Sequence, residues 1–78
     1  MKHEPEAAYR RRIGQHIRQH LEETGISENA LSVRAGLSNK TVTSLINSSY
    51  SPSLKTLCKL GPAIDVPVWR MLAPKGEL

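Results

Sequence analysis

Apolar residues recur three and four positions apart over most of this chain, which is the period of one face of an α-helix. The clearest rows, in chain order, are Ile13, Ile17 and Leu21; Leu54, Leu57, Leu60 and Ile64; and Val68, Met71 and Leu72. No segment alternates apolar and polar residues as a half-buried strand does. The pattern therefore predicts an all-α chain of about five short helices.

Serine and glycine residues mark the ends of these predicted helices, because serine is a preferred N-cap and glycine commonly follows the last helical residue. The expected helices are 9–23, ended by Gly25; 28–35, between Ser27 and Gly36; 38–46, opened by Ser38; a fourth capped by Ser53; and a short last one that begins at Pro67. Because proline lacks a backbone N–H, we expect Pro62 to break or kink the fourth helix after Leu60. The buried face of the second helix is expected to be Ala30, Leu31 and Val33.

The length of 78 residues allows one small domain. We expect a flexible N-terminal tail over 1–8, the domain over 9–73 and a C-terminal tail over 74–78. A single cysteine, Cys58, excludes an internal disulfide, so apolar packing must supply the stability. The chain has neither an apolar run long enough to span a membrane nor the apolar segment of a signal peptide. These features predict a soluble protein of the cytoplasm.

The charge distribution indicates a polyanionic partner. The formal net charge is +4, and no acidic residue lies between Asn29 and Ile64. Basic residues stand in that stretch and in the first helix: Arg34, Lys40, Lys55 and Lys59, and Arg10, Arg11, Arg12 and Arg18. A basic face of this kind indicates nucleic acid first and anionic lipid second, with a merely solvated surface as the alternative. A membrane-surface binder would also need an exposed apolar face, and the apolar rows found here are all needed for the core.

Two short helices joined by a turn at Gly36 and Leu37 have the spacing of a helix-turn-helix unit, whose second helix enters the major groove of DNA. The motifs around this turn are Gly25-Ile26-Ser27, Leu31, Ala35-Gly36-Leu37-Ser38, Thr41-Val42, Leu45, Pro52-Ser53 and Leu57. In this register the chain resembles the Cro and phage-repressor family of lambda-repressor-like DNA-binding domains, over about Ile13 to Leu72. The resemblance implies a five-helix, all-α fold with the helix-turn-helix formed by helices 2 and 3.

The third predicted helix has one apolar side and one side of short polar residues. With Leu37, Val42, Leu45 and Ile46 facing the domain, the residues opposite them face outward. Their amide, ammonium and hydroxyl groups can hydrogen-bond to base edges in the major groove, so we expect base readout by Asn39, Lys40, Thr43 and Ser44. Phosphate contacts, which give affinity but no sequence information, are expected from Ser38, Asn47, Arg10, Arg11, Arg12 and Lys55. The place of Asn47 in this list rests on a phosphate-binding position of the family.

The chain departs from the family pattern at several positions. An ion pair that the family carries between the first and third helices is replaced by Leu21 and Ile46, which we expect to pack together. Glu28 stands where the family prefers a phosphate-binding Gln, and an anion there would repel the DNA backbone. Ser48 replaces a family Gly after the third helix, and we expect Asn47 to adopt the left-handed conformation instead.

Trp69 lies beside the apolar row of the last helix, where the family usually has a polar residue. Two interpretations stay open: a homodimer contact, or packing over the domain's own surface. His16 and His20 share one helix face, but zinc would need further ligands, and we expect His20 to pack at the edge of the core. No nucleophile, base and orienting group come together in the sequence. We therefore expect no metal, no cofactor, no small-molecule ligand and no enzymatic activity.

The function expected from these observations is that of a sequence-specific transcriptional regulator that binds double-stranded DNA. It would be a repressor acting as a homodimer on a pseudo-palindromic operator, located in the cytoplasm at the nucleoid. The alternative is a protein-interaction module of the same fold, such as an antitoxin that binds a partner protein. The acid-free, short-polar face of the third helix favours a DNA groove over an apolar partner.

Overall fold

A computed structural model describes residues 6–72 of the chain and is all-helical over that range, as the sequence predicts. The helices are α1 (Glu6–Thr24), α2 (Glu28–Ala35), α3 (Asn39–Ile46), α4 (Leu54–Ile64) and α5 (Val68–Leu72). Helix α1 begins earlier than expected, so residues 6–8 are helical and not part of a tail. The Oγ of Ser51 donates a hydrogen bond of 2.6 Å to the Glu6 carboxylate in this added turn. Residues 1–5 and 73–78 lie outside the described range. They include the rest of the expected N-terminal tail, the last residue of the expected domain and the expected C-terminal tail.

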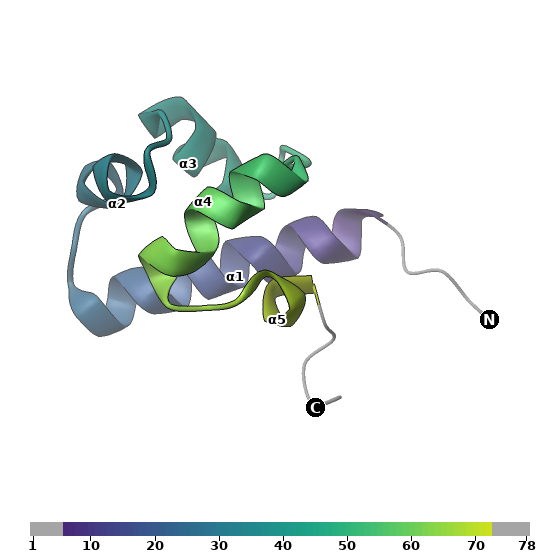
Figure 1. Cartoon of the computed structure of the whole chain (residues 1–78), viewed down its shortest axis with the longest axis horizontal. Coiled ribbons are helices and arrows are strands. Elements are labelled where there is room, and N and C mark those ends of the chain that lie inside the picture. The colour runs from purple at the N-terminus through teal and green to yellow at the C-terminus, as the bar shows by residue number, and fades with distance from the viewer. Residues whose placement is uncertain (1–5, 73–78) are drawn as a thin grey trace.

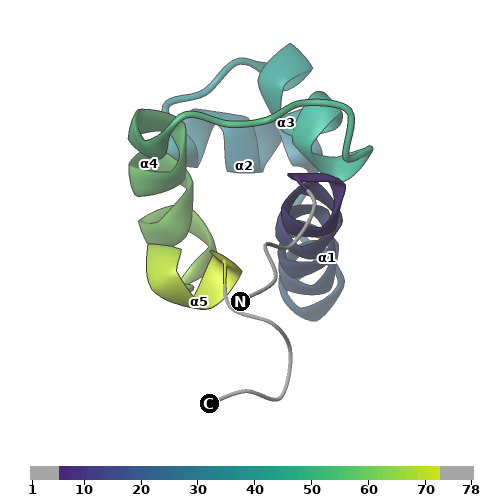
Figure 2. The same ribbon diagram turned by 90° about the vertical axis from the view of Figure 1, so that its right-hand side faces the viewer.

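The long helix α1 runs along the base of the fold in Figure 1 and contacts three of the other four helices. It packs against α3, α4 and α5, while α2 packs against α3 and α4. Helices α2 and α3 lie together at one end of the fold, and α5 lies at the opposite end, as both views agree (Figures 1 and 2). This arrangement separates the helix-turn-helix from the last helix.

The core contains one or more residues from each of the five helices. Its fully buried large side chains are Ile13, Ile17, Leu31, Val42, Leu45, Leu60 and Met71. The expected apolar rows of α1 and α4 are thereby confirmed, except that Leu54 is 67% exposed at the start of α4. No helix within residues 6–72 is long and apolar enough to cross a membrane.

The expected buried face of α2 is wrong in two of its three residues. Leu31 is buried, but Ala30 is exposed and Val33 is 77% exposed. The buried side of α2 consists instead of Leu31, Ser32 and Ala35. Because residues two positions apart lie on nearly opposite sides of a helix, burial of Leu31 directs Val33 toward solvent.

The three serine N-caps are confirmed. The hydroxyl of Ser27 accepts a hydrogen bond from the backbone N–H of Ala30 over 3.0 Å. Ser38 and Ser53 accept from Thr41 and Thr56 over 3.1 and 3.2 Å in the same way. Each cap satisfies one of the N–H groups that a helix leaves without a partner at its start.

Helices α2, α3 and α4 end in the same way, with a left-handed residue after the last helical turn. The left-handed residues are Gly36, Ser48 and Asp65, with φ angles of 70°, 59° and 57°. In each case the following N–H bonds to a carbonyl five residues earlier: Leu37 to Ser32, Ser49 to Ser44, and Val66 to Gly61. This is the Schellman arrangement. The expected left-handed Asn47 is therefore wrong, because Asn47 has a φ of −80° and Ser48 takes that role.

The expected break at Pro62 is also wrong, since α4 continues through Pro62 to Ile64, and the alternative, a kink there, stays a prediction. Proline removes one hydrogen bond, the one to the carbonyl of Cys58 four residues earlier. Pro62 and Cys58 are both exposed, so water can reach this side of the helix. The Schellman turn at Asp65, with buried Ala63 and Ile64 before it, holds the last turn in place.

Candidate nucleic-acid interface

A short turn sets the position of α3 relative to α2. Gly36 adopts the left-handed conformation that L-residues rarely take, Leu37 is half-buried beneath the turn, and Ser38 caps α3. The two helices pack directly on each other. This geometry is that of a helix-turn-helix, as the sequence predicts.

Helix α1 holds the C-terminal end of α3 from below. A Cβ on Gly14 would lie 2.9 Å from the carbonyl oxygen of Ile46 and 3.0 Å from that of Leu45, so only glycine permits this approach. One turn further along α1, the Nη2 of Arg18 donates a hydrogen bond of 2.9 Å to the Ile46 carbonyl. A cation is favourable there because carbonyl groups at a helix C-terminus carry partial negative charge. These contacts could not be predicted from the sequence, since neither Gly14 nor Arg18 belongs to a recognised motif.

Helix α3 presents a polar face to solvent. Its inner side is buried through Val42 and Leu45. Four residues opposite them are exposed, namely Asn39, Lys40, Thr43 and Asn47, while Ser44 is half-buried. We call these five residues the outer row. All four residues expected to read bases therefore lie in one row on one helix.

Asn39 is held by two hydrogen bonds from α2. Its Nδ2 donates to the Oδ1 of Asn29 over 2.8 Å. Its Oδ1 lies 2.8 Å from the Oγ of Ser32, whose single hydrogen is shared between this oxygen and the backbone carbonyl of Asn29 at 2.7 Å. Ser32 is 3% exposed, so the surrounding residues restrict the position of its hydroxyl group. An amide that would otherwise rotate freely therefore has a set orientation at the start of α3.

Thr43 forms a second polar contact between the two helices. Its Oγ1 donates a hydrogen bond of 3.2 Å to the Oε1 of Glu28 at the start of α2. Since Asn39 and Thr43 are four residues apart, both contacts lie on the same side of α3. The first turn of α2 thus lies beside the part of the outer row that contains Asn39 and Thr43.

The remaining polar residues of the α3 region differ in whether their groups already form hydrogen bonds within the protein. The Ser38 hydroxyl is occupied by its own helix, through the Thr41 N–H and the Thr41 hydroxyl. Lys40 is exposed in the first turn. The backbone carbonyl of Ser44 takes part in the Schellman turn, because it accepts hydrogen bonds from the N–H and the Oγ of Ser49.

The structure separates the basic residues expected to contact phosphates. Arg10 lies near the end of α3, because its carbonyl accepts from the Oγ of Ser48 over 3.3 Å. Arg11 and Lys55 are exposed. Arg12 instead donates from Nη1 to the carbonyl of Leu72 over 2.6 Å and lies 5.3 Å from the centroid of the Tyr9 ring. The guanidinium thus connects α1 to the end of α5, and α5 lies at the end of the fold away from α3.

Other expectations concern the interior. Leu21 and Ile46 are both half-buried against the core, as their pairing requires, and the pairing itself stays a prediction. His20 is buried at 8% exposure, as expected for a residue at the core edge, and its Nε2 has no partner among residues 6–72.

Burial lowers the pKa of His16 below its usual 6.5. The positive charges of Arg70 and Arg12 also lower this pKa, whereas a hydrogen bond to the Arg70 backbone raises it. No metal-binding group of three ligands occurs in the described range.

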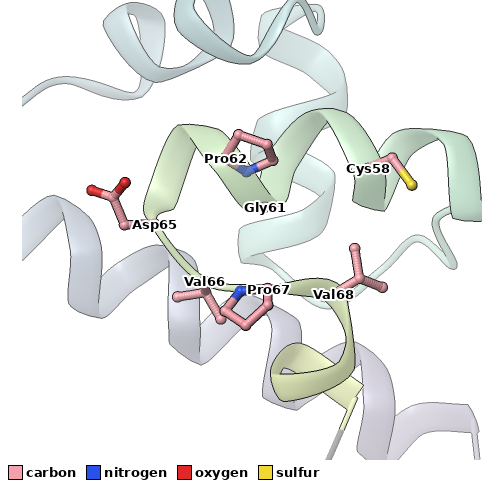
Figure 3. A pocket seen from close by; sticks show the side chains of 7 residues that line it. All are labelled: Cys58, Gly61, Pro62, Asp65, Val66, Pro67 and Val68. Carbon is pink, nitrogen blue, oxygen red and sulfur yellow. The ribbon is translucent and has the colours of Figure 1, made fainter.

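The end of the fold opposite α3 carries an exposed aromatic residue on α5 and an apolar hollow between α4 and α5. Trp69 is 59% exposed on α5, so packing over the domain's own surface leaves most of it uncovered. The hollow lies between the end of α4 and the start of α5 (Figure 3). Its lining residues are Cys58, Gly61, Pro62, Asp65, Val66, Pro67 and Val68.

The fold and the outer row define a helix-turn-helix protein of the DNA-binding class. The helix-turn-helix family model matches residues 17–68, which are most of the chain, and the chain therefore belongs to the lambda-repressor and Cro-like helix-turn-helix family. Membership makes it a DNA-binding regulator. Neither the curated proteins nor the solved structures contain a match to it.

Proposed function

We propose that the protein is a sequence-specific transcriptional repressor that places α3 in the major groove of its operator. One observation carries the proposal: the outer row is polar and mostly exposed, and two of its residues, Asn39 and Thr43, are hydrogen-bonded to side chains of α2. A helix for which solvation was the only requirement would not need Asn29, Ser32 and Glu28 to hold its side chains. Fixed side chains are what base readout requires, because bidentate hydrogen bonds depend on orientation.

Each residue of the interface has a chemical role in this proposal. Asn39, Lys40, Thr43 and Ser44 read base edges, with Lys40 suited to guanine and Asn39 to adenine. Ser38, Asn47, Arg10, Arg11 and Lys55 contact phosphates. Arg12 is assigned to the support of α5, because its guanidinium is already engaged with the Leu72 carbonyl.

The operator is pseudo-palindromic and is bound by two copies of the chain. Each copy reads one half-site, and the half-sites lie about 34 Å apart, one turn of the DNA helix. The exposed Trp69 supports a dimer contact, because tryptophan is enriched in the cores of protein interfaces. Occupancy of the operator excludes RNA polymerase, and the protein acts in the cytoplasm at the nucleoid.

The test is a selection of binding sites from a random duplex library with the wild type, Lys40→Ala and Lys59→Ala. We expect the wild type to enrich a pseudo-palindromic motif and Lys40→Ala to lose a preferred guanine in each half-site. Lys59→Ala removes the same charge from an exposed position of α4 and serves as the matched control. Absence of any enriched motif with the wild type would overturn the proposal.

A further inference from the structure

Glu28 is an acidic residue within a basic helix-turn-helix. It is the first residue of α2, and no other acidic residue lies from Gly25 to Ile64. Its side chain is exposed, and its Oε1 accepts the hydrogen bond of Thr43. The neighbouring Asn29 holds Asn39 at the same edge. The carboxylate is therefore fixed beside the outer row, where it would meet whatever approaches Thr43.

The chemistry of a carboxylate limits what it can meet in DNA. An ionised carboxylate only accepts hydrogen bonds. In the major groove, only the amino groups of cytosine and adenine donate, whereas guanine O6 and N7 and thymine O4 accept. Phosphate oxygens also accept and carry a negative charge. Glu28 is thus unfavourable at the DNA backbone and at guanine or thymine, and favourable at an amino group.

Thr43 has the same preference because of its bond to Glu28. A threonine hydroxyl has a single hydrogen and two acceptor lone pairs. In the structure this hydrogen points to the Glu28 carboxylate, so only lone pairs remain for DNA. The two side chains together present acceptors alone. Adenine offers its N6 amino group next to the acceptor N7, while cytosine offers an N4 amino group with no acceptor beside it, so cytosine suits the pair better.

We propose that Glu28, held by Thr43, is a specificity-determining residue that selects a cytosine in each half-site. Its carboxylate accepts from the cytosine N4 amino group, and it disfavours guanine or thymine at that position because two acceptors would then face each other. The inference rests on the proposed function, since it requires α3 and the first turn of α2 to lie along the major groove.

The experiment is a site selection from a random duplex library with the wild type, Glu28→Gln and Glu28→Ala. Binding to the selected duplex and to its variants at the cytosine position is then measured over a range of salt concentrations. Glu22→Gln removes the same charge from an exposed position of α1 and is the matched control. Glu28 is exposed, so these variants should fold, which circular dichroism will verify.

We expect the wild type to bind cytosine over guanine at one position of each half-site by roughly five- to a hundredfold. Glu28→Ala should abolish this preference and leave the rest of the motif unchanged. Glu28→Gln should shift the preference toward adenine, because an amide can pair with adenine N6 and N7 together. Glu22→Gln should retain the wild-type motif.

Two results would overturn the inference while leaving the proposed function intact. One is an unchanged motif for Glu28→Ala with tighter binding to all sequences and a steeper salt dependence, which would mean that Glu28 only repels phosphates. The other is an unchanged motif with unchanged affinity. A wild-type protein that enriches no motif would overturn the proposed function and the inference with it.

Discussion

The side-chain amide of Asn39 on α3 donates a hydrogen bond of 2.8 Å to the side-chain oxygen of Asn29 on α2. Together with the contact to Ser32, it restrains the side chain of the first polar residue of α3. In the proposed function, the accuracy of readout by α3 would thus depend on residues of α2 that need not touch DNA.

Asn29→Ala should weaken operator binding without changing the fold. The Asn39 amide loses one of its two partners and regains rotational freedom, which should cost about 1 kcal/mol, or roughly fivefold in Kd. Fluorescence anisotropy with a labelled operator measures the change. Gln15→Ala, at an exposed position of α1, is the control and should bind as the wild type does. Equal Kd values for Asn29→Ala and the wild type would contradict this role.

Gly14→Ala should destabilise the domain and displace α3. The added methyl group would lie 2.9 Å from the carbonyl oxygen of Ile46, which is backbone and can move only with its helix. Overpacking of this kind costs about 1–3 kcal/mol, or roughly 4–20 °C in the melting temperature of so small a domain. Thermal unfolding followed by circular dichroism measures it. Alanine at the neighbouring Gln15 should leave the melting temperature almost unchanged, and an unchanged value for Gly14→Ala would refute the close approach.

His20→Leu should stabilise the domain. The imidazole is buried at 8% exposure, and its Nε2 lacks a hydrogen-bond partner within the described residues. Because an unsatisfied buried polar atom costs about 1–3 kcal/mol, an apolar residue of similar volume should raise the free energy of unfolding by about 1 kcal/mol. Urea denaturation of the variant and the wild type gives the difference. A lower midpoint for the variant would indicate that the nitrogen is satisfied in solution.

Acid should destabilise the domain through His16. Burial lowers its pKa in the folded state, so between that lowered value and the usual 6.5 the unfolded chain binds more protons than the folded chain. The stability contributed by neutral His16 is fully present above pH 6.5 and is lost as the pH falls through this window. The titrating imidazole lies near Arg70 and Arg12, which makes a proton there less favourable. The difference in unfolding free energy between the wild type and His16→Gln should therefore change between about pH 7 and pH 5, and a constant difference would contradict the assignment.

Trp69→Ala should weaken self-association while leaving the monomer folded. The side chain is 59% exposed on α5. Its removal should therefore change the free energy of unfolding of the monomer little and lower the association constant of the proposed dimer strongly. Sedimentation equilibrium of the variant and the wild type compares their association constants. Leu54→Ala removes another exposed apolar side chain, at the start of α4, and should associate as the wild type does. Identical association of Trp69→Ala and the wild type would remove the dimer contact from the proposal.

The features that the sequence predicted correctly are those set by local chemistry. Ser27, Ser38 and Ser53 cap helices because a serine hydroxyl needs only the N–H groups of the next turn. The inward rows of α1 and α4 follow from helical periodicity. The same local reasoning was wrong at Pro62, because buried neighbours and a Schellman turn keep the helix intact beyond it.

What the sequence did not indicate depends on contacts between distant segments. The approach of Gly14 to Ile46 and the bond from Arg12 to Leu72 join residues far apart in the chain. The contact between Thr43 and Glu28 likewise requires the packed helix pair. The outer row could be placed on one face from spacing alone, whereas the residues that hold it could be found only from the fold.

The bond from Arg12 to the Leu72 carbonyl also bears on how the domain can be joined to other proteins. It fixes the end of α5 against α1, at the pole of the molecule opposite α3 (Figures 1 and 2). A fluorescent reporter or an effector domain attached downstream of Leu72 would therefore start from the side turned away from bound DNA. With α3 in the groove as proposed, this geometry would let the domain carry an attached cargo to its operator without obstructing the access of α3 to DNA.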